Sequence, residues 1–518
     1  MIDLVCKNFN KVIFLYNGSN PMQLGFLNDH PQIKAAIWDP APGNVGFDSL
    51  GKILNGEINP SGKTTDTFLY DLTKSPWWNN SGATKYTNMQ DMALKLPVAK
   101  GVYFNLAPSF TNYVEDIYVG YKYYETAAAE GTIDYGKTVQ YPFGYGLSYT
   151  DFTQKMSPVT KNGKNLEFTV TVKNTGSVAG KDAVEVYDNP PYTNGGIEKA
   201  SANLVTMKKT NLLKPGESQN VKISFPLEQL ASYDYLNTKG YVLDQGDYQL
   251  SVNSDSHNIL DKQTYTVANK VTFDKSNPRS TDKQAATNKI SEIAGDVTYL
   301  SRKDHFANYA AATAAPASDV MPDKYKNQYH VNKNFDRNTY INKNDKMPTT
   351  GAKNNIKLKD LRGVDPNDPR WDKLLDEMSV DDMSKLSSMA GFQTPAVDSI
   401  GKVATTDADG PAAINNNFTK QGSLGFPIAV VLANTWSPTL ARQYGEMMGQ
   451  MAREMGIVGW YAPAMNTHRT AVGGRNFEYY SEDGELAGTI APPTPWPGPS
   501  RRASTPTSST SRSTMPTP

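Results

Sequence analysis

The sequence is poor in the residues that build disulfide and metal frameworks. It contains one cysteine, Cys6, among 518 residues, which excludes an intrachain disulfide framework and a zinc site made of several thiolates. Its five histidines are scattered, and none forms the HExxH spacing of a helical zinc site. The sequence therefore predicts no metal site and no cofactor.

Long apolar runs and an excess of charge of one sign are missing as well. No stretch approaches the ~20 consecutive apolar residues that a transmembrane helix needs. The 52 Lys and Arg residues balance 52 Asp and Glu residues, so charge offers no argument for a nucleic acid or a membrane surface as partner. Met1–Lys7 lacks the basic segment and apolar run of a secretory signal, which predicts a cytoplasmic location if Met1 is the natural start.

What remains is the composition of a soluble globular protein, 38% hydrophobic and 20% charged with a mean hydropathy of -0.54. The length suffices for two to four domains of ~100–200 residues each. Nothing in the sequence indicates the oligomeric state.

Residues 1–150 have an α/β pattern. The apolar runs Lys11–Tyr16 and Ala35–Trp38 suit buried parallel strands, and Phe47–Leu54 is typical of a helix. Ile2–Val5 resembles the end of an amphipathic helix with no earlier segment to pack against, so we expect that upstream sequence is missing. This region is therefore interpreted as a partial α/β sandwich domain.

Residues 151–270 have an all-β pattern. Leu166–Val172 alternates strictly between apolar and polar residues, as a half-buried antiparallel strand does. Further strands are expected at Ala183–Tyr187, Asn220–Phe225 and Tyr248–Val252, with turn signals such as Asn174-Thr-Gly176 and Pro215-Gly216 between the strands. Short strands at this spacing predict an immunoglobulin-like sandwich.

The remaining chain divides into three segments. Residues 271–355 are interpreted as a long linker that lies partly over the surface of a neighbouring domain. In 356–490 we expect helices at Asp381–Met389 and Thr439–Glu454 and strands at Phe426–Ala433 and Ile457–Tyr461. Residues 491–518 hold eight Pro, six Ser and six Thr but no Asp, Glu or Lys, a composition that predicts a disordered tail.

Two segments of 356–490 carry candidate binding groups. In Asp407-Ala-Asp409-Gly-Pro411, a carboxylate at the C-terminal end of a barrel strand could accept hydrogen bonds from sugar hydroxyls, although a solvent-facing turn explains the same residues. In Asn466–Asp483, two glycines precede Arg475 and could aim its guanidinium into a cleft. We interpret Ser481-Glu-Asp483 as the capped start of a helix. The glycine- and aromatic-rich segment Tyr141–Thr150 favours packing between domains.

Several of these motifs together resemble glycoside hydrolase family 3, the family of β-glucosidases and β-xylosidases. The resemblance rests on the following segments: Asn17–Phe68, Ile117–Glu125 and Pro142–Thr150 for its α/β sandwich domain; Val172–Gly176 and Leu213–Glu217 for its fibronectin-III-like domain; and Asp409-Gly-Pro411 with Gly473–Asp483 for its barrel domain. The domain order is permuted. The implied fold is a multidomain α/β plus all-β protein with a partial α/β sandwich (1–150), a fibronectin-III-like β-sandwich (151–270) and a partial (β/α) TIM-type barrel (356–490).

The resemblance implies hydrolysis of terminal β-linked glucosyl or xylosyl residues with retention, on a β-glucoside or oligosaccharide substrate. That reaction needs two carboxyl groups ~5–5.5 Å apart, one attacking and one donating a proton. By resemblance, Asp409 would bind hydroxyls of the terminal sugar and Arg475 would assist, with His468 and Arg469 as further substrate-binding candidates. Many members place an arginine six positions after the equivalent of Asp409, where this sequence has Asn415.

Other expected parts are not found. Neither the nucleophilic aspartate nor the proton-donating glutamate can be identified, nor can the family's Lys-His sugar-binding pair, so we expect a chain truncated at both ends, inactive as written and poorly ordered over 356–490 in isolation. One permitted choice of codons for the tail, read two bases later, encodes a Lys-His-Phe-Ala-x-Asn pattern, which suggests a reading-frame shift near Ala491. The alternatives are a non-catalytic carbohydrate-binding or adhesion protein and an inactive gene fragment.

Overall fold

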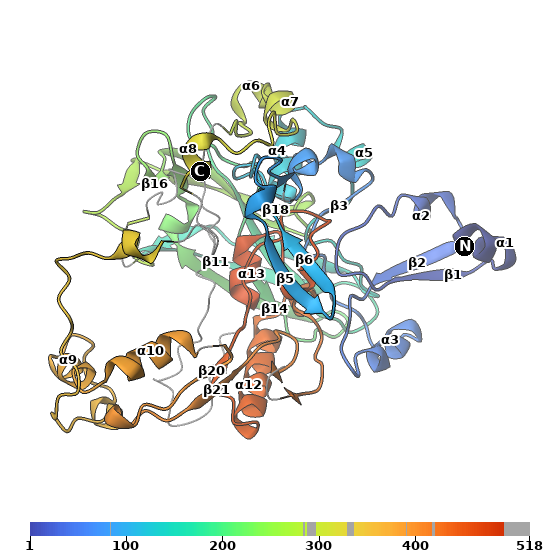
Figure 1. Ribbon diagram of the computed structural model, residues 1–518. Helices are drawn as coiled ribbons and strands as arrows, with labels where there is room; N and C mark the ends of the chain where they lie inside the picture. Colours follow the sequence, from blue (N-terminus) through green and yellow to red (C-terminus); the bar gives the residue numbers. More distant parts are fainter. Residues whose placement is uncertain are drawn as a thin grey trace.

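The computed structural model describes residues 1–82, 84–282, 285–286, 297–328, 336–389, 391–416 and 420–491. Three regions pack around a shared core, with a β-sandwich at the centre and an N-terminal lobe, residues 2–54, projecting to one side (Figure 1). The predicted disordered tail and the proposed frame shift fall after residue 491, outside the described residues. No helix in the described ranges has both the length and the apolar character that crossing a bilayer requires.

The first region mixes helices with short strands. Strands β1 and β2 pair in parallel, with Ile13 opposite Ala35, and the helix predicted at Phe47–Leu54 is confirmed as α3. Its elements are α1 Ile2–Asn8, β1 Val12–Tyr16, α2 Phe26–Asp29, β2 Ile33–Trp38, α3, β3 Phe68–Leu69, β4 Thr84–Lys85, β5 Leu94–Ala99, β6 Val102–Leu106, β7 Ser109–Phe110, α4 Tyr121–Ala129, α5 Tyr135–Thr138 and β8 Val139–Tyr141.

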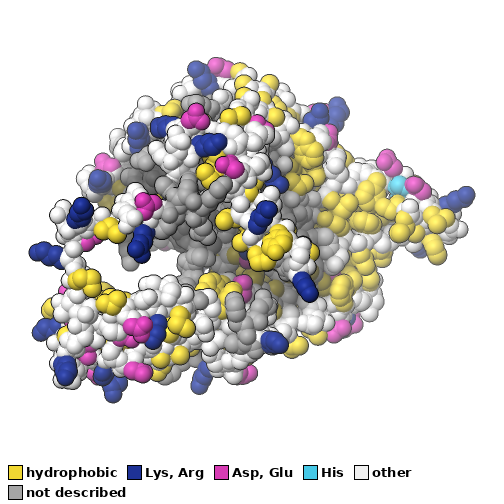
Figure 2. Space-filling view, in the orientation of Figure 1, with side chains coloured by type: hydrophobic (Ala, Val, Ile, Leu, Met, Phe, Trp, Pro, Cys, Tyr) yellow, Lys and Arg dark blue, Asp and Glu magenta, His cyan; other side chains and the backbone are white. Residues whose placement is uncertain are grey.

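Apolar side chains gather on the surface of the projecting N-terminal lobe (Figure 2). This apolar surface comprises Leu4, Val5, Phe9, Ile13, Leu15, Val45, Phe47 and Leu54. In the described part of the chain β1 and β2 form a sheet of two strands only. Parallel strands are normally covered on both faces, so this lobe is unusually open.

The second region is the predicted β-sandwich. In β11 buried residues alternate with more exposed ones, because successive side chains point to opposite faces of a strand. Val170, Val186 and Leu250 contribute to a core enclosed between two four-stranded sheets. The first sheet holds β9 Phe152–Met156, β10 Thr160–Asn162, β11 Asn165–Asn174 and β14 Ser218–Pro226, and the second holds β12 Ala183–Asn189, β13 Asn203–Lys209, β17 Gly246–Asn253 and β18 Ile259–Val267.

A smaller sheet and a long connecting segment follow. The strands β15 Ser232–Asp234, β16 Gly240–Leu243 and β19 Val271–Phe273 form a three-stranded sheet. The connector carries α6 Lys303–Phe306, α7 Tyr309–Ala312 and α8 Asp323–Lys326. Leu300, Phe306 and Ala312 pack against Tyr118 and Tyr123 of the first region, so this part of the segment lies over the α/β region.

The third region holds one parallel strand pair with helices between its strands. Asp407 of β21 lies opposite Gly459 of β24 in parallel register, and the Ser379 hydroxyl caps α10. The elements are α9 Arg370–Leu375, α10 Val380–Ser388, β20 Gln393–Thr394, β21 Thr405–Ala408, β22 Asn415–Asn416, β23 Gln421–Gly422, α11 Ala429–Asn434, α12 Pro438–Glu454, β24 Gly459–Trp460 and α13 Gly484–Ile490.

The strand predicted at Phe426–Ala433 is wrong, because Ala429–Asn434 forms helix α11. Ala429, Val430, Leu432 and Ala433 are all buried in it. A short apolar run has the same pattern in a buried strand as in a buried helix, so periodicity could not separate the two.

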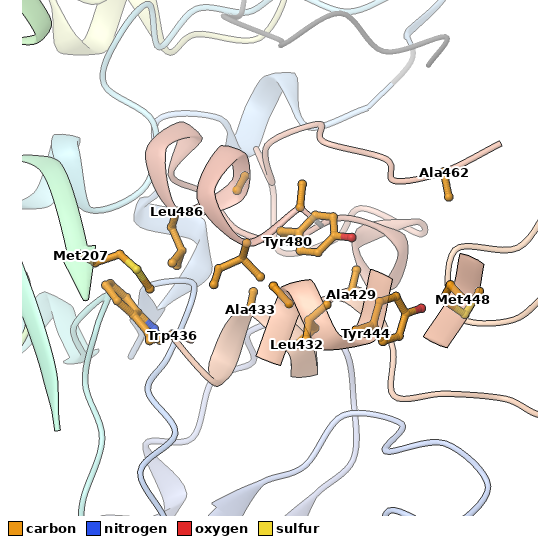
Figure 3. Packing of buried hydrophobic residues seen from close by; sticks show 14 of the residues in the cluster. Met207, Ala429, Leu432, Ala433, Trp436, Tyr444, Met448, Ala462, Tyr480 and Leu486 are labelled. Carbon is orange, nitrogen blue, oxygen red and sulfur yellow. The ribbon is translucent and has the colours of Figure 1, made fainter. Parts of the chain in front are cut away.

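The core of the third region extends into the other two (Figure 3). Trp436, Tyr480 and Leu486 meet Met207 of β13 in one buried cluster. Phe143 is fully buried in the same cluster, with its ring stacked on Tyr121 at 4.6 Å between centroids and 5.2 Å from the Trp436 ring. The segment Tyr141–Thr150 thus packs between domains, as predicted.

Phe143→Ala should destabilise the whole protein. Removing a fully buried ring leaves a cavity where the three regions meet, and Phe→Ala changes in cores cost ~3–5 kcal/mol. Chemical denaturation followed by circular dichroism measures the loss. Phe104→Ala, at a residue 62% exposed on β6, is the matched control and should change the unfolding free energy by less than ~0.5 kcal/mol. Equal effects of the two variants would contradict the role of Phe143.

Candidate functional site

Asp409 directly follows the carboxyl end of β21, the edge at which parallel strands in barrels present binding groups. Its backbone is held on both sides: the Asp409 N–H donates to the Asn415 carbonyl at 2.8 Å, and the Asn415 N–H returns a bond of 3.0 Å. The Trp460 indole donates to the Gly410 carbonyl at 3.0 Å. The Asp409 side chain is exposed, and its Oδ1 accepts from the Gly410 N–H.

Arg475, like Asp409, lies at the surface. Its side chain is 68% exposed, and its guanidinium pairs with Glu478, with Nη2 2.6 Å from Oε2. The hydrogen bond to Glu478 raises the pKa of Arg475, and the Asp409 carboxylate adds a smaller contribution of the same sign. The loop that precedes it is held by the Asn20 amide, which donates to the carbonyls of Ala471 and Gly473. The Asp409 charge thus acts on Arg475, but the partner that the guanidinium contacts is Glu478 of its own loop.

His468 is placed differently, in the buried interface with the α/β region. Its Nδ1 lies 2.6 Å from Asp66 Oδ1, and its Nε2 donates to the Asn476 carbonyl at 2.9 Å. Burial alone would lower the pKa of His468, but the Asp66 carboxylate and the two hydrogen bonds outweigh burial and raise it. The pair therefore favours an imidazolium facing a carboxylate, with both side chains at most 3% exposed.

Arg469 also reaches into the α/β region. Its Nε lies 2.9 Å from Glu115 Oε1, and its other nitrogens donate to the carbonyls of Asn80 and Asn112. The guanidinium carbon lies 4.8 Å from the centre of the Tyr113 ring. Burial raises the pKa of Glu115, and the charge of Arg469 opposes that rise. The Arg469 guanidinium is thus bound by the neighbouring region, whereas His468 is bound by Asp66 of that region and by Asn476 of its own.

Ser481, Glu482 and Asp483 precede α13, and the predicted helix start is confirmed because the Asp483 carboxylate accepts from the Leu486 N–H. The sequence did not predict their second role, which is to bind the third region to the α/β region. Glu482 accepts from the Thr67 hydroxyl at 2.6 Å and from the Tyr121 N–H at 2.8 Å. The Ser481 hydroxyl donates to a backbone carbonyl of the same α/β segment. The density of polar residues in this motif was a signal, but their partners lie hundreds of positions away.

Gly120 allows this close approach. It has φ +59°, and a Cβ at this position would lie 2.2 Å from the Glu482 carboxyl carbon. Burial, together with the nearby Asp66 charge, raises the pKa of Glu482 to about 7, although hydrogen bonds from Thr67 and Tyr121 oppose the rise.

The interface encloses a cavity of about 30 Å³ lined by Asp66, Thr67, His468 and Glu482 among others. That volume suits a water molecule but not a sugar ring. Neither this cavity nor a second one of about 410 Å³ includes Asp409 or Arg475. Within the described ranges no three His, Cys, Asp or Glu side chains are grouped so that they could hold a metal ion.

Comparison with known proteins matches three parts of the chain. Residues 1–149 match the glycosyl hydrolase family 3 C-terminal domain, 182–256 a fibronectin type III-like domain, and 408–494 the glycosyl hydrolase family 3 N-terminal domain. The chain is 28% identical to β-glucosidase A of Butyrivibrio fibrisolvens over 95% of this chain and 58% of that protein. It is 27% identical to a β-glucosidase of Ruminococcus albus over 94% of this chain and 46% of that one.

Among solved structures, a β-glucosidase from Paenibacillus barengoltzii has a TM-score of 0.69 and 25% identity, over 94% of this chain and 50% of that chain. The chain thus spans about half the length of the curated relatives it matches.

Glu482→Gln should make stability less dependent on pH. The pKa of Glu482 rises from 4.5 to about 7 on folding, so the folded state holds a proton that the unfolded state releases, and stability falls as pH rises across that interval. Glutamine mimics the protonated form and removes this loss. Melting temperatures between about pH 5 and pH 8 measure the effect.

The melting temperature of Glu482→Gln should fall less steeply between about pH 5 and pH 8 than that of the parent protein. Other buried acids titrate in the same range, so only the difference between variant and parent is informative. Glu57→Gln, at an exposed glutamate 4.0 Å from Lys52, is the control. It should leave the slope of melting temperature against pH unchanged. If the melting temperatures of Glu482→Gln and the parent changed in parallel with pH, the raised pKa of Glu482 would be contradicted.

Proposed function

Because the chain belongs to glycosyl hydrolase family 3, with the family's C-terminal domain first, its fibronectin type III-like domain next and part of its N-terminal domain last, we propose that its function is β-glucosidase-type hydrolysis. The proposed substrates are β-glucosides or oligosaccharides with a terminal β-linked glucosyl or xylosyl residue. The extent of the similarity to β-glucosidases, over nearly the whole of this chain, supports the reaction class.

The proposed contribution of the described residues is to hold the terminal sugar. The observation that carries this step is the exposed Asp409 carboxylate at the carboxyl end of β21, with its backbone fixed on both sides by Asn415. A carboxylate can accept hydrogen bonds from two adjacent sugar hydroxyls, and such charge-assisted bonds are stronger than neutral ones. The parallel pairing of β21 and β24, with α11 and α12 between them, supports the interpretation of residues 356–490 as part of a (β/α) barrel.

The proposed roles of His468 and Arg469 are positional. Both hold the motif that contains Arg475 against the α/β region, through Asp66 and Glu115. They would therefore affect a bound sugar through the placement of Arg475 rather than through direct contact.

Turnover by this chain is proposed to be slow. Retaining hydrolysis needs an attacking carboxylate and a proton donor ~5–5.5 Å apart, and we assign neither group among the described residues. Loss of one such group costs orders of magnitude in rate. A sugar-binding protein without turnover is the second candidate, and it is favoured by the same exposed acceptor, Asp409, together with the lack of an assigned pair of catalytic carboxyls among the described residues.

An aryl β-glucoside assay combined with glucose titration tests the proposal. We expect saturable glucose binding and slow release of the aryl group, and Asp409→Asn should weaken binding roughly tenfold because a charge-assisted hydrogen bond contributes ~1.5–3 kcal/mol. Asp372→Asn, on an exposed residue of α9, is the matched control and should bind glucose as the parent does. Binding without release would favour the second candidate. Failure to bind or hydrolyse any β-glucoside would refute both.

A further inference from the structure

The 410 Å³ cavity lies between helix α4 of the α/β region and the outer face of the sandwich sheet that contains β12, β17 and β18. Its volume falls within the ~300–1,000 Å³ typical of small-molecule sites. It is separate from the surface that carries Asp409 and Arg475, and none of the residues discussed for hydrolysis lines it.

The floor of this cavity is made by alternate residues of β17. Gln249, Ser251 and Asn253 line the cavity, whereas Leu250 and Val252 point into the sandwich core. Ser251 and Asn253 are 7% and 2% exposed, so these polar side chains are buried on the sheet's outer face. Buried polar groups are normally satisfied by hydrogen bonds, yet Asn253 Oδ1 has no hydrogen-bond partner in the described part of the chain.

One wall is a rigid network around Glu125 of α4. The Glu125 carboxylate accepts from the Tyr135 hydroxyl at 2.6 Å and the Ser256 hydroxyl at 2.9 Å, and His257 Nδ1 lies 2.9 Å from it. The Tyr135 and His257 rings stack with centroids 3.7 Å apart. The next turn of α4 presents only Ala128 and Ala129, which leaves the space open.

The charges around the cavity are mixed. Glu125 and Asp188 are acidic, whereas His257 and Lys262 are basic, so the lining has no strong preference for an ion of either sign. Burial raises the pKa of Asp188 to about 7, although Lys122 and Lys199 oppose the rise, so its carboxyl can both donate and accept near neutral pH. Amides and hydroxyls supply further groups of both kinds.

We propose that this cavity binds a small neutral polyol of the sugar class. Sugar hydroxyls both donate and accept hydrogen bonds, and they match a lining of amides, hydroxyls and oppositely charged groups better than an ion would. The site does not depend on the proposed hydrolysis, because it uses the α/β region and the sandwich alone.

Titration of the full chain with glucose and with cellobiose, by calorimetry and saturation-transfer NMR, tests this site. Ala128→Phe should fill the cavity and weaken binding there about tenfold or more, since the inserted ring occupies the ligand volume. Asp409→Asn should leave this binding intact, which separates the cavity from the proposed glycone site. Gln249→Ala and Ser251→Ala remove hydrogen-bonding groups without adding bulk, and each should weaken binding severalfold even if Ala128→Phe folds poorly.

Three results would overturn the proposal. These are sugar binding that Asp409→Asn abolishes while all three cavity variants retain it, absence of saturable binding by either sugar in the Asp409→Asn protein, and binding of inorganic phosphate in competition with the sugar. The last would identify an anion site.

Discussion

The buried pair of His468 and Asp66 joins segments 402 positions apart and fastens the third region to the first. Its two side chains are almost fully removed from water, so each charge depends on the other and on the Asn476 carbonyl for stabilisation. Arg469 forms a second ion pair with the first region through Glu115, and Glu482 accepts hydrogen bonds from Thr67 and Tyr121 of that region. The motif that carries Arg475 owes its position to this interface, because its own strand pair is short and has no barrel around it in the described ranges.

An interface of this kind combines two sorts of contact with different consequences. The aromatic cluster around Phe143 and Trp436 supplies apolar burial, which is strong but tolerant of orientation. The hydrogen bonds to Thr67, Tyr121 and Asp66 tolerate little displacement, because an unpaired buried polar group is costly. The apolar contacts thus hold the regions together, and the polar contacts determine their register.

Local patterns in the sequence were sufficient for elements whose neighbours are close in the chain. The alternation in β11, the helix at α10 and the capped start of α13 are examples. Helix α11 was mistaken for a strand because its environment, rather than its pattern, decides its conformation. Asp409 and Arg475 could be nominated from their motifs, and both lie at the surface of the third region. The engagement of His468 with Asp66 could not be foreseen, since a sequence does not show which distant carboxylate a buried histidine will meet.

The open N-terminal lobe has a consequence for the solubility of the protein. Its paired strands β1 and β2 present apolar side chains such as Ile13 and Leu15 beside unpaired backbone edges, within the described part of the chain. Exposed apolar patches and unpaired strand edges favour association between protein molecules and aggregation. We therefore expect this lobe, more than the buried core of the sandwich, to limit the concentration at which the protein stays in solution.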